Sequence, residues 1–165
     1  MLSATFAQGA PPSAGALSFN VPEAEGAGRI DAPELELPLR TVAPDYFATL
    51  GVSLVAGRSF TADETERVVI VNDCLARRLW DGASPIGRRC RFGPNAPWHT
   101  VVGVAADVKE QGLEDSVGDG MEAYFPYERG TAERYFTVIV RTSADHASTV
   151  QQVKQHLWRS TRMCR

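Results

Sequence analysis

Residues 67–80 read R-V-V-I-V-N-D-C-L-A-R-R-L-W, and the fold class follows largely from this stretch. Residues 67–72 form a continuous, mostly β-branched run, which is typical of a strand covered on both faces. Asn72 or Asp73 is placed to cap a helix over residues 73–80. One face of that helix carries the apolar residues Leu75, Ala76, Leu79 and Trp80. The basic residues Arg77 and Arg78 point away from that face.

Further strands are predicted on the C-terminal side of this unit. Arg89 and Arg91 alternate with Cys90 and Phe92 inside a strand over residues 86–92. Residues 98–108 are the strongest strand candidate, with Gly103 at a bulge or a close contact. Two more strands are predicted over residues 121–127 and 134–141. A helix is predicted over residues 144–158, where apolar residues recur at helical spacing: Ala147, Val150, Val153 and Leu157.

On the N-terminal side, Leu35, Leu37 and Leu39 alternate with polar residues or proline. That period of two predicts a half-buried strand, and Pro38 favours a position at a sheet edge. A short helix is expected over residues 43–50, ended by Gly51.

Shorter elements complete this side of the chain. Residues 52–55 read as a strand, whereas residues 61–64 have capping-box spacing but favour a turn, because no amphipathic run follows. Residues 1–33 form a poorly defined segment with possible edge strands at 2–6 and 16–21. The core domain is placed at residues 34–158. Six to eight strands and three helices in this order indicate an α+β fold with a mixed sheet.

The totals of the sequence restrict the class of protein. The chain has 165 residues, which suits one domain, and its net charge of −3 gives no reason to expect nucleic acid or anionic lipid as a partner. The longest apolar run, residues 68–71, is far shorter than the roughly 20 residues of a spanning helix. The N-terminus lacks the basic and apolar regions of a secretory signal.

No catalytic, cofactor-binding or metal-binding residue is predicted. His99 and Asp107 lie in or beside one apolar strand, and the sequence holds no G-x-S-x-G, G-x-G-x-x-G or P-loop motif. His146 and His156 are ten residues apart, which is not a metal-ligand spacing. The three cysteines form no C-x-x-C pair, although a Cys74–Cys90 disulfide stays possible in an oxidising compartment; the third is Cys164.

Three other sets of side chains were candidates for binding. Arg89 and Arg91 share one strand face beside Arg88, and such a pair is either a solvated surface or an anion contact. The acidic loop is interpreted as solvated, because it lacks the ordered oxygens and turn glycine of a calcium site: Asp63, Glu64 and Glu66. The aromatic residues are interpreted as core, with at least one ring of residues 124–127 exposed and available to a partner: Tyr46, Phe47, Phe60, Tyr124, Phe125 and Tyr127.

Five motifs in order resemble a known family. They are V-A-P-D-Y-F (42–47) with T-L-G (49–51), G-R-S-F (57–60), V-V-I-V-N-D-C-L-A-R-R-L-W (68–80) with P-I-G (85–87), T-V-V-G-V-A-A-D-V (100–108) and Y-F-P-Y (124–127). This succession resembles the MacB-like periplasmic core domain of FtsX-like ABC transporter permeases. In particular, it is similar to that domain in the large duplicated permeases of bacteria such as acidobacteria. The resemblance spans roughly residues 35 to 157.

The resemblance implies different roles for this domain and for the other parts of the transporter. The domain would sit outside the inner membrane, on its periplasmic face, between a first transmembrane helix and a later group of three. A separate cytoplasmic ATPase would drive a homodimer or pseudo-dimer, and the outer domains would pass on the motion without bond chemistry. The resemblance implies no cofactor.

The tail W-R-S-T-R-M-C-R (158–165) departs from the family. Relatives tend to read A-L-D-P-x-x-P there, and one GC-rich coding of this tail gives Ala-Leu-Asp-Pro-Asp-Val-Pro in another frame. We therefore hypothesise that a frameshift near Leu157 truncates a parent permease, leaving residues 159–165 as a non-native tail. The competing interpretations are a free-standing extracytoplasmic module that binds a small ligand or protein, and, with least support, an enzyme.

Overall fold

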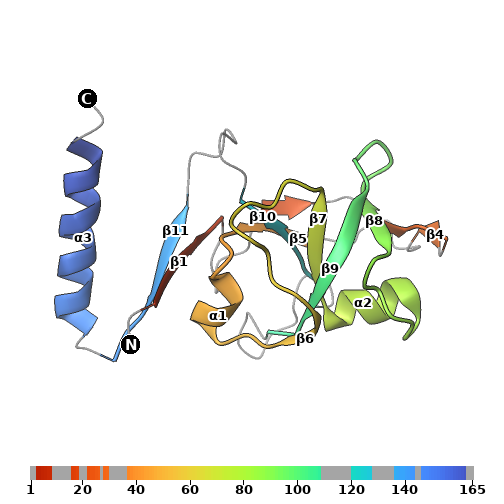
Figure 1. Ribbon diagram of the computed structural model, residues 1–165, viewed down its shortest axis with the longest axis horizontal. Coiled ribbons are helices and arrows are strands. Elements are labelled where there is room, and N and C mark those ends of the chain that lie inside the picture. The colour runs from red at the N-terminus through yellow and green to blue at the C-terminus, as the bar shows by residue number, and fades with distance from the viewer. Residues whose placement is uncertain are drawn as a thin grey trace.

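A single mixed β-sheet with three helices makes up the computed structural model of the chain (Figure 1). The structure describes residues 3–8, 16–18, 22–26, 28–29, 37–108, 120–127, 136–143 and 146–162. Within them the strands are β1 (Ser3–Ala7), β2 (Ala16–Ser18), β3 (Pro22–Ala24), β4 (Gly28–Arg29), β5 (Leu37–Val42), β6 (Leu54–Gly57), β7 (Val68–Asn72), β8 (Arg89–Phe92), β9 (His99–Ala105), β10 (Ala123–Pro126) and β11 (Thr137–Arg141). The helices are α1 (Tyr46–Leu50), α2 (Asp73–Trp80) and α3 (His146–Arg162).

The order of the strands in the sheet is β11-β1-β5-β10-β7-β9-β8-β3-β4, with β2 also beside β5 and β6 also beside β9. The pairs β5–β10 and β7–β9 are parallel, and the other pairs are antiparallel. The expectation of a mixed sheet with a few helices is therefore confirmed. The described residues contain more strands than the six to eight expected, because β3 and β4 have only two or three residues and carry no readable periodicity.

Strand β7 lies at the centre of the sheet and is buried along its whole length, as the β-branched run predicted. Successive side chains of a strand point to opposite faces. Val69 and Val71 accordingly join the apolar cluster under α2, whereas Val68 and Ile70 join the cluster under α1. The two short helices thus cover opposite faces of the sheet.

Helix α2 has the predicted bounds and the predicted orientation. Asn72 is the N-cap and accepts a hydrogen bond from the Leu75 amide, while the helix ends at Asp81 in the left-handed conformation. The four apolar residues named above are buried, and Arg77 and Arg78 are exposed. Local capping and an apolar stripe are sufficient to set this element.

Strand β5 corrects one prediction. It lies inside the sheet, between β1 and β10, and not at an edge. Pro38 lies before the parallel pairing with β10, which begins at Leu39, and is opposite Leu17 of β2. Both faces of β5 are covered, so that Arg40, expected on a solvent face, has no exposed surface.

Strand β9 contains the predicted irregularity at Gly103. Its pairing with β7 shifts by one residue, from Val69 opposite Val101 to Ile70 opposite Gly103. A Cβ atom on Gly103 would lie 2.4 Å from the carbonyl oxygen of Arg58, so a side chain has no room there. The shift also turns Val101 and Val104 to the same face, where both join the α2-side cluster.

Candidate functional site

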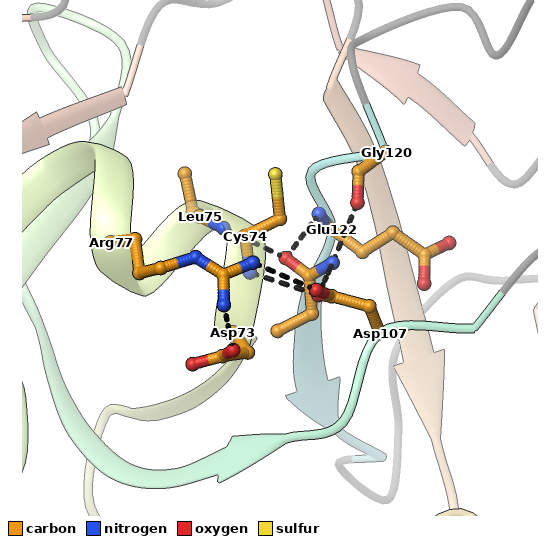
Figure 2. Close-up of polar contacts among 8 residues, drawn as sticks. Asp73, Cys74, Leu75, Arg77, Asp107, Gly120 and Glu122 are labelled. Atoms are coloured by element: carbon orange, nitrogen blue, oxygen red, sulfur yellow. Dashed lines mark hydrogen bonds and ion pairs between the residues drawn. The ribbon is translucent and has the colours of Figure 1, made fainter.

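Asn72 forms the centre of a polar network where β7 ends. Figure 2 shows residues of this network, among them Asp107, Gly120 and Glu122. The Asn72 side-chain oxygen accepts hydrogen bonds from the amides of Leu75 (3.1 Å) and Glu122 (2.9 Å). Its side-chain nitrogen donates to the Asp107 carboxylate (2.8 Å) and the Gly120 carbonyl (2.6 Å). All four hydrogen-bonding positions of this buried amide are therefore used, which is the condition for burying it without loss of stability.

Asp107 joins the segment after β9 to the first turn of α2. One carboxylate oxygen accepts from the Cys74 amide (2.8 Å), and the other pairs with Arg77 (3.1 Å). Arg77 also pairs with Asp73 one turn away on the same helix. The Arg77 and Asp107 side chains are about half exposed, so the ion pair contributes little and the amide hydrogen bonds matter more.

A second, fully buried group adjoins this network through Glu122. The Glu122 carboxylate accepts from the Arg40 guanidinium (3.2 Å) and from the Tyr124 hydroxyl. Arg40 and Tyr124 are direct neighbours on the parallel strands β5 and β10. Burial is the first cause that raises the pKa of Tyr124, so the phenol stays protonated and acts as a donor.

The two groups form one continuous network. The Glu122 backbone makes two hydrogen bonds to Asn72. Its amide donates to the Asn72 side chain, and its carbonyl accepts from the Asn72 amide at 3.0 Å. The network thereby connects β5, β7, β10, α2 and the end of β9. This network is the candidate functional site.

The hypothetical acid–base pair of His99 and Asp107 does not form. The two residues lie at opposite ends of β9, on the order of 20 Å apart at the rise of a strand. The His99 ring packs edge-on against Phe125 at a centroid distance of 5.0 Å. His146 and His156 fall in α3, and their side chains lie outside the described part of the chain.

Neither Cys74 nor Cys90 takes part in a disulfide, so the pairing considered from the sequence is not formed. Cys90 is buried in the α2-side cluster, and burial raises its pKa to about 12. A thiol with such a pKa is a poor nucleophile at neutral pH. Cys164 lies outside the described residues.

The basic strand face is neutralised within the domain. Arg89 pairs with Glu25 and Arg91 with Glu23, so that the antiparallel β3–β8 pair carries a ladder of opposite charges. The hydrogen bond from Arg89 lowers the pKa of Glu25. Arg91 also lies 4.8 Å from the Trp98 ring centre. These contacts favour the interpretation of a solvated surface over that of an anion site.

The acidic loop is held by the nearby side chain of Arg58. Arg58 donates to Glu64 at 2.8 Å, and this hydrogen bond is the main reason why the pKa of Glu64 is lowered. Glu64 also accepts weakly from Thr61, which confirms a turn at residues 61–64. Across the described residues, no group of three or more His, Cys, Asp and Glu side chains is arranged to hold a metal ion.

The aromatic residues divide into two kinds. Tyr46, Phe47, Phe60 and Tyr124 are buried in the α1-side cluster, as expected of core. Phe125 and Tyr127 are half-buried and contact other rings.

Sequence reasoning found Asn72 as a cap but missed its bond to Asp107 and the Arg40–Glu122 pair. The members of that pair are 82 residues apart, so no spacing motif could connect them. The one available signal was an arginine inside an otherwise apolar strand pattern, which a surface interpretation explained equally well.

Comparison with known proteins agrees with this architecture. The family described as MacB-like periplasmic core domain matches residues 7–157. No helix in the described part of the chain is long and apolar enough to cross a membrane. A search of curated proteins finds no match.

Solved structures share the fold at low sequence identity. The periplasmic region of MacB from Actinobacillus actinomycetemcomitans is 18% identical with a TM-score of 0.64, over 94% of this chain and 65% of that one. A domain of a putative permease from Porphyromonas gingivalis is 16% identical with a TM-score of 0.62, over 95% and 69%. The extracellular domain of the noncanonic ABC-type transporter YknZ from Gram-positive bacteria is 17% identical with a TM-score of 0.57, over 91% and 68%.

Proposed function

The chain belongs to the family of MacB-like periplasmic core domains, and from that premise we propose that it serves as the extracytoplasmic, non-catalytic domain of an ABC transporter permease. In the parent permease, transmembrane helices flank the domain at the periplasmic face of the inner membrane. A separate cytoplasmic ATPase drives the subunits, which act in pairs. The domain relays their conformational change during export.

The buried network around Asn72 and Glu122 is the observation that carries this proposal. It joins four strands and a helix through hydrogen bonds between groups that lie on different elements. Close-packed layers of this kind shift as units and do not deform gradually. A rigid body is what a relay of motion needs, because a soft domain would absorb the displacement.

The test uses the intact permease together with the ATPase encoded beside it, reconstituted in vesicles. One variant carries Glu122→Gln, which removes the carboxylate charge that faces the Arg40 guanidinium. A matched control carries Arg78→Ala on the exposed face of α2. We expect the first variant to keep assembly with the ATPase but to lose stimulation of ATP hydrolysis by the permease, and the control to behave as the wild type. Equal stimulation in both variants would refute the relay.

A further inference from the structure

We propose that the edge hairpin is a strap, held over the buried Cys90 by two ion pairs, that opens while the rest of the sheet stays folded. The edge hairpin consists of β3, β4 and the turn residues Glu25 and Gly26. It lies at the end of the sheet opposite to β11, and β4 is the outermost of the described strands there (Figure 1). The inference goes beyond the relay, because it names a part of the domain that moves on its own.

Strand β3 is paired with its neighbours over a short length. It lies opposite β8 over three residues, from Pro22 opposite Phe92 to Ala24 opposite Cys90. Pro22 has no amide hydrogen and therefore donates no hydrogen bond to this ladder. On its other side, β3 meets β4 over two residues. The central strand β7, in contrast, pairs with β9 along all five of its residues. A short hairpin at the end of a sheet opens at a lower free-energy cost than a central strand.

Two ion pairs fasten the edge hairpin to β8. The Nε of Arg89 donates to Glu25 at 2.8 Å, and its Nη2 donates to the other oxygen of the same carboxylate. Arg91 donates to one oxygen of Glu23, through Nε at 3.0 Å and through Nη2 at 2.8 Å. The side chains of both pairs are partly exposed to solvent, so salt screens their attraction. Since both pairs bridge the same two strands, losing them together raises the open fraction about three- to tenfold.

The strap covers apolar surface, which keeps it closed most of the time. Ala24 is 2% exposed and Cys90 has no exposed surface, and both belong to the α2-side cluster. Strand β3 also contacts α2. Opening therefore uncovers this side of the cluster, and the pKa of Cys90, which burial raises, returns toward its ordinary value of 9.0. The thiolate is the reactive form, so the reactivity of Cys90 reports the opening.

Hydrogen exchange followed by mass spectrometry locates the opening in the 165-residue chain. In the closed hairpin the Glu25 amide donates to the Arg89 carbonyl at 2.9 Å. We expect a peptide that covers residues 22–29 to be less protected than one that covers β7. Its exchange rate should rise about three- to tenfold between about 0.05 and 1 M sodium chloride. Equal protection of both peptides would show that the hairpin opens only with the whole sheet, and would overturn the inference.

Labelling of Cys90 tests whether the opening uncovers the cluster. The background carries Cys74→Ser and Cys164→Ser, which leaves Cys90 as the single thiol. The reagent is an uncharged aromatic disulfide, so that salt does not act on the reagent's own charge. We expect the labelling rate to rise with salt by the same factor, and to depend on urea far less than global unfolding does, because a local opening exposes little surface. A rate with the full urea dependence of global unfolding would contradict the strap.

Exchange of the charges within one pair identifies what holds the strap. Glu25→Arg places two arginines side by side and should raise the labelling rate at low salt about tenfold. Adding Arg89→Glu should restore the rate of the parent background. The matched control is Asp63→Asn with Glu66→Gln, which changes the net charge equally at exposed positions of the acidic loop and should leave the rate unchanged. Failure of the exchanged pair to restore the rate would overturn the inference. These experiments contain no ATPase, so the strap and the relay can fail independently.

Discussion

Asn72, the last residue of β7, donates a hydrogen bond of 2.8 Å to Asp107, which follows the end of β9. Since β7 and β9 are parallel neighbours, this bond ties their carboxyl ends together. The same two side chains bind the first amides of α2, Asn72 at Leu75 and Asp107 at Cys74. The helix is therefore oriented by two strands at once.

Replacement of Asn72 by alanine is expected to lower the free energy of unfolding by about 2–4 kcal/mol. It removes the helix cap and leaves the Glu122 amide without its side-chain acceptor. Urea denaturation measures the change. Arg78→Ala on the same helix should stay within about 0.5 kcal/mol of the wild type, because that side chain is exposed. A loss below 1 kcal/mol for Asn72→Ala would mean that water replaces the amide, contrary to the proposed rigidity.

The buried ion pair of Arg40 and Glu122 is expected to show strong coupling in a double-mutant cycle. Arg40→Met and Glu122→Gln should each cost about 3 kcal/mol or more, since each strands a charge or a buried polar group. The double variant should cost clearly less than the sum, and glutamine still accepts from Tyr124. The exposed pair Arg77–Asp73 is the control cycle, with a coupling of at most about 0.5 kcal/mol. Additive losses in the buried cycle would contradict this account.

Substitution of Gly103 by alanine is expected to be among the most damaging single-methyl changes. The new Cβ would lie 2.4 Å from the Arg58 carbonyl and 3.2 Å from Ile70, so backbone must move. The free energy of unfolding should fall by about 3 kcal/mol or more. Gly82→Ala is the comparison, since Gly82 has open space and only a φ of +80°, a strain of about 1 kcal/mol. Thermal unfolding of both variants would show whether the steric clash at Gly103 costs more stability than the backbone strain at Gly82.

Cys90 is expected to make stability fall at alkaline pH. Its pKa is about 12 in the folded protein, against an ordinary value of 9.0, because burial disfavours the thiolate. The folded state keeps its proton more tightly, so this contribution is complete below pH 9 and is lost as pH rises from there toward 12. The difference in unfolding free energy between wild type and Cys90→Ala should narrow across that window. A constant difference would show that Cys90 does not titrate as a buried thiol.

Several elements could be predicted because the interactions that set them are local. The continuous β-branched run along residues 68–72, the cap at Asn72 and the apolar stripe of α2 involve residues within a few positions of one another. The same holds for Gly51, whose φ of +76° ends α1, and for the alternation of Cys90 and Phe92 with two arginines in β8. Periodicity and capping therefore predict these elements without any information on tertiary contacts.

The position of β5 and the whole of the candidate site were decided by pairings between distant segments. The buried Arg40 meets Glu122, which lies 82 residues further along the chain, because β10 pairs with β5. Asp107 reaches Asn72 only because β7 and β9 run in parallel. Which strand becomes a neighbour depends on the packing of the whole sheet, and a buried charge is stable only after that packing supplies its partner.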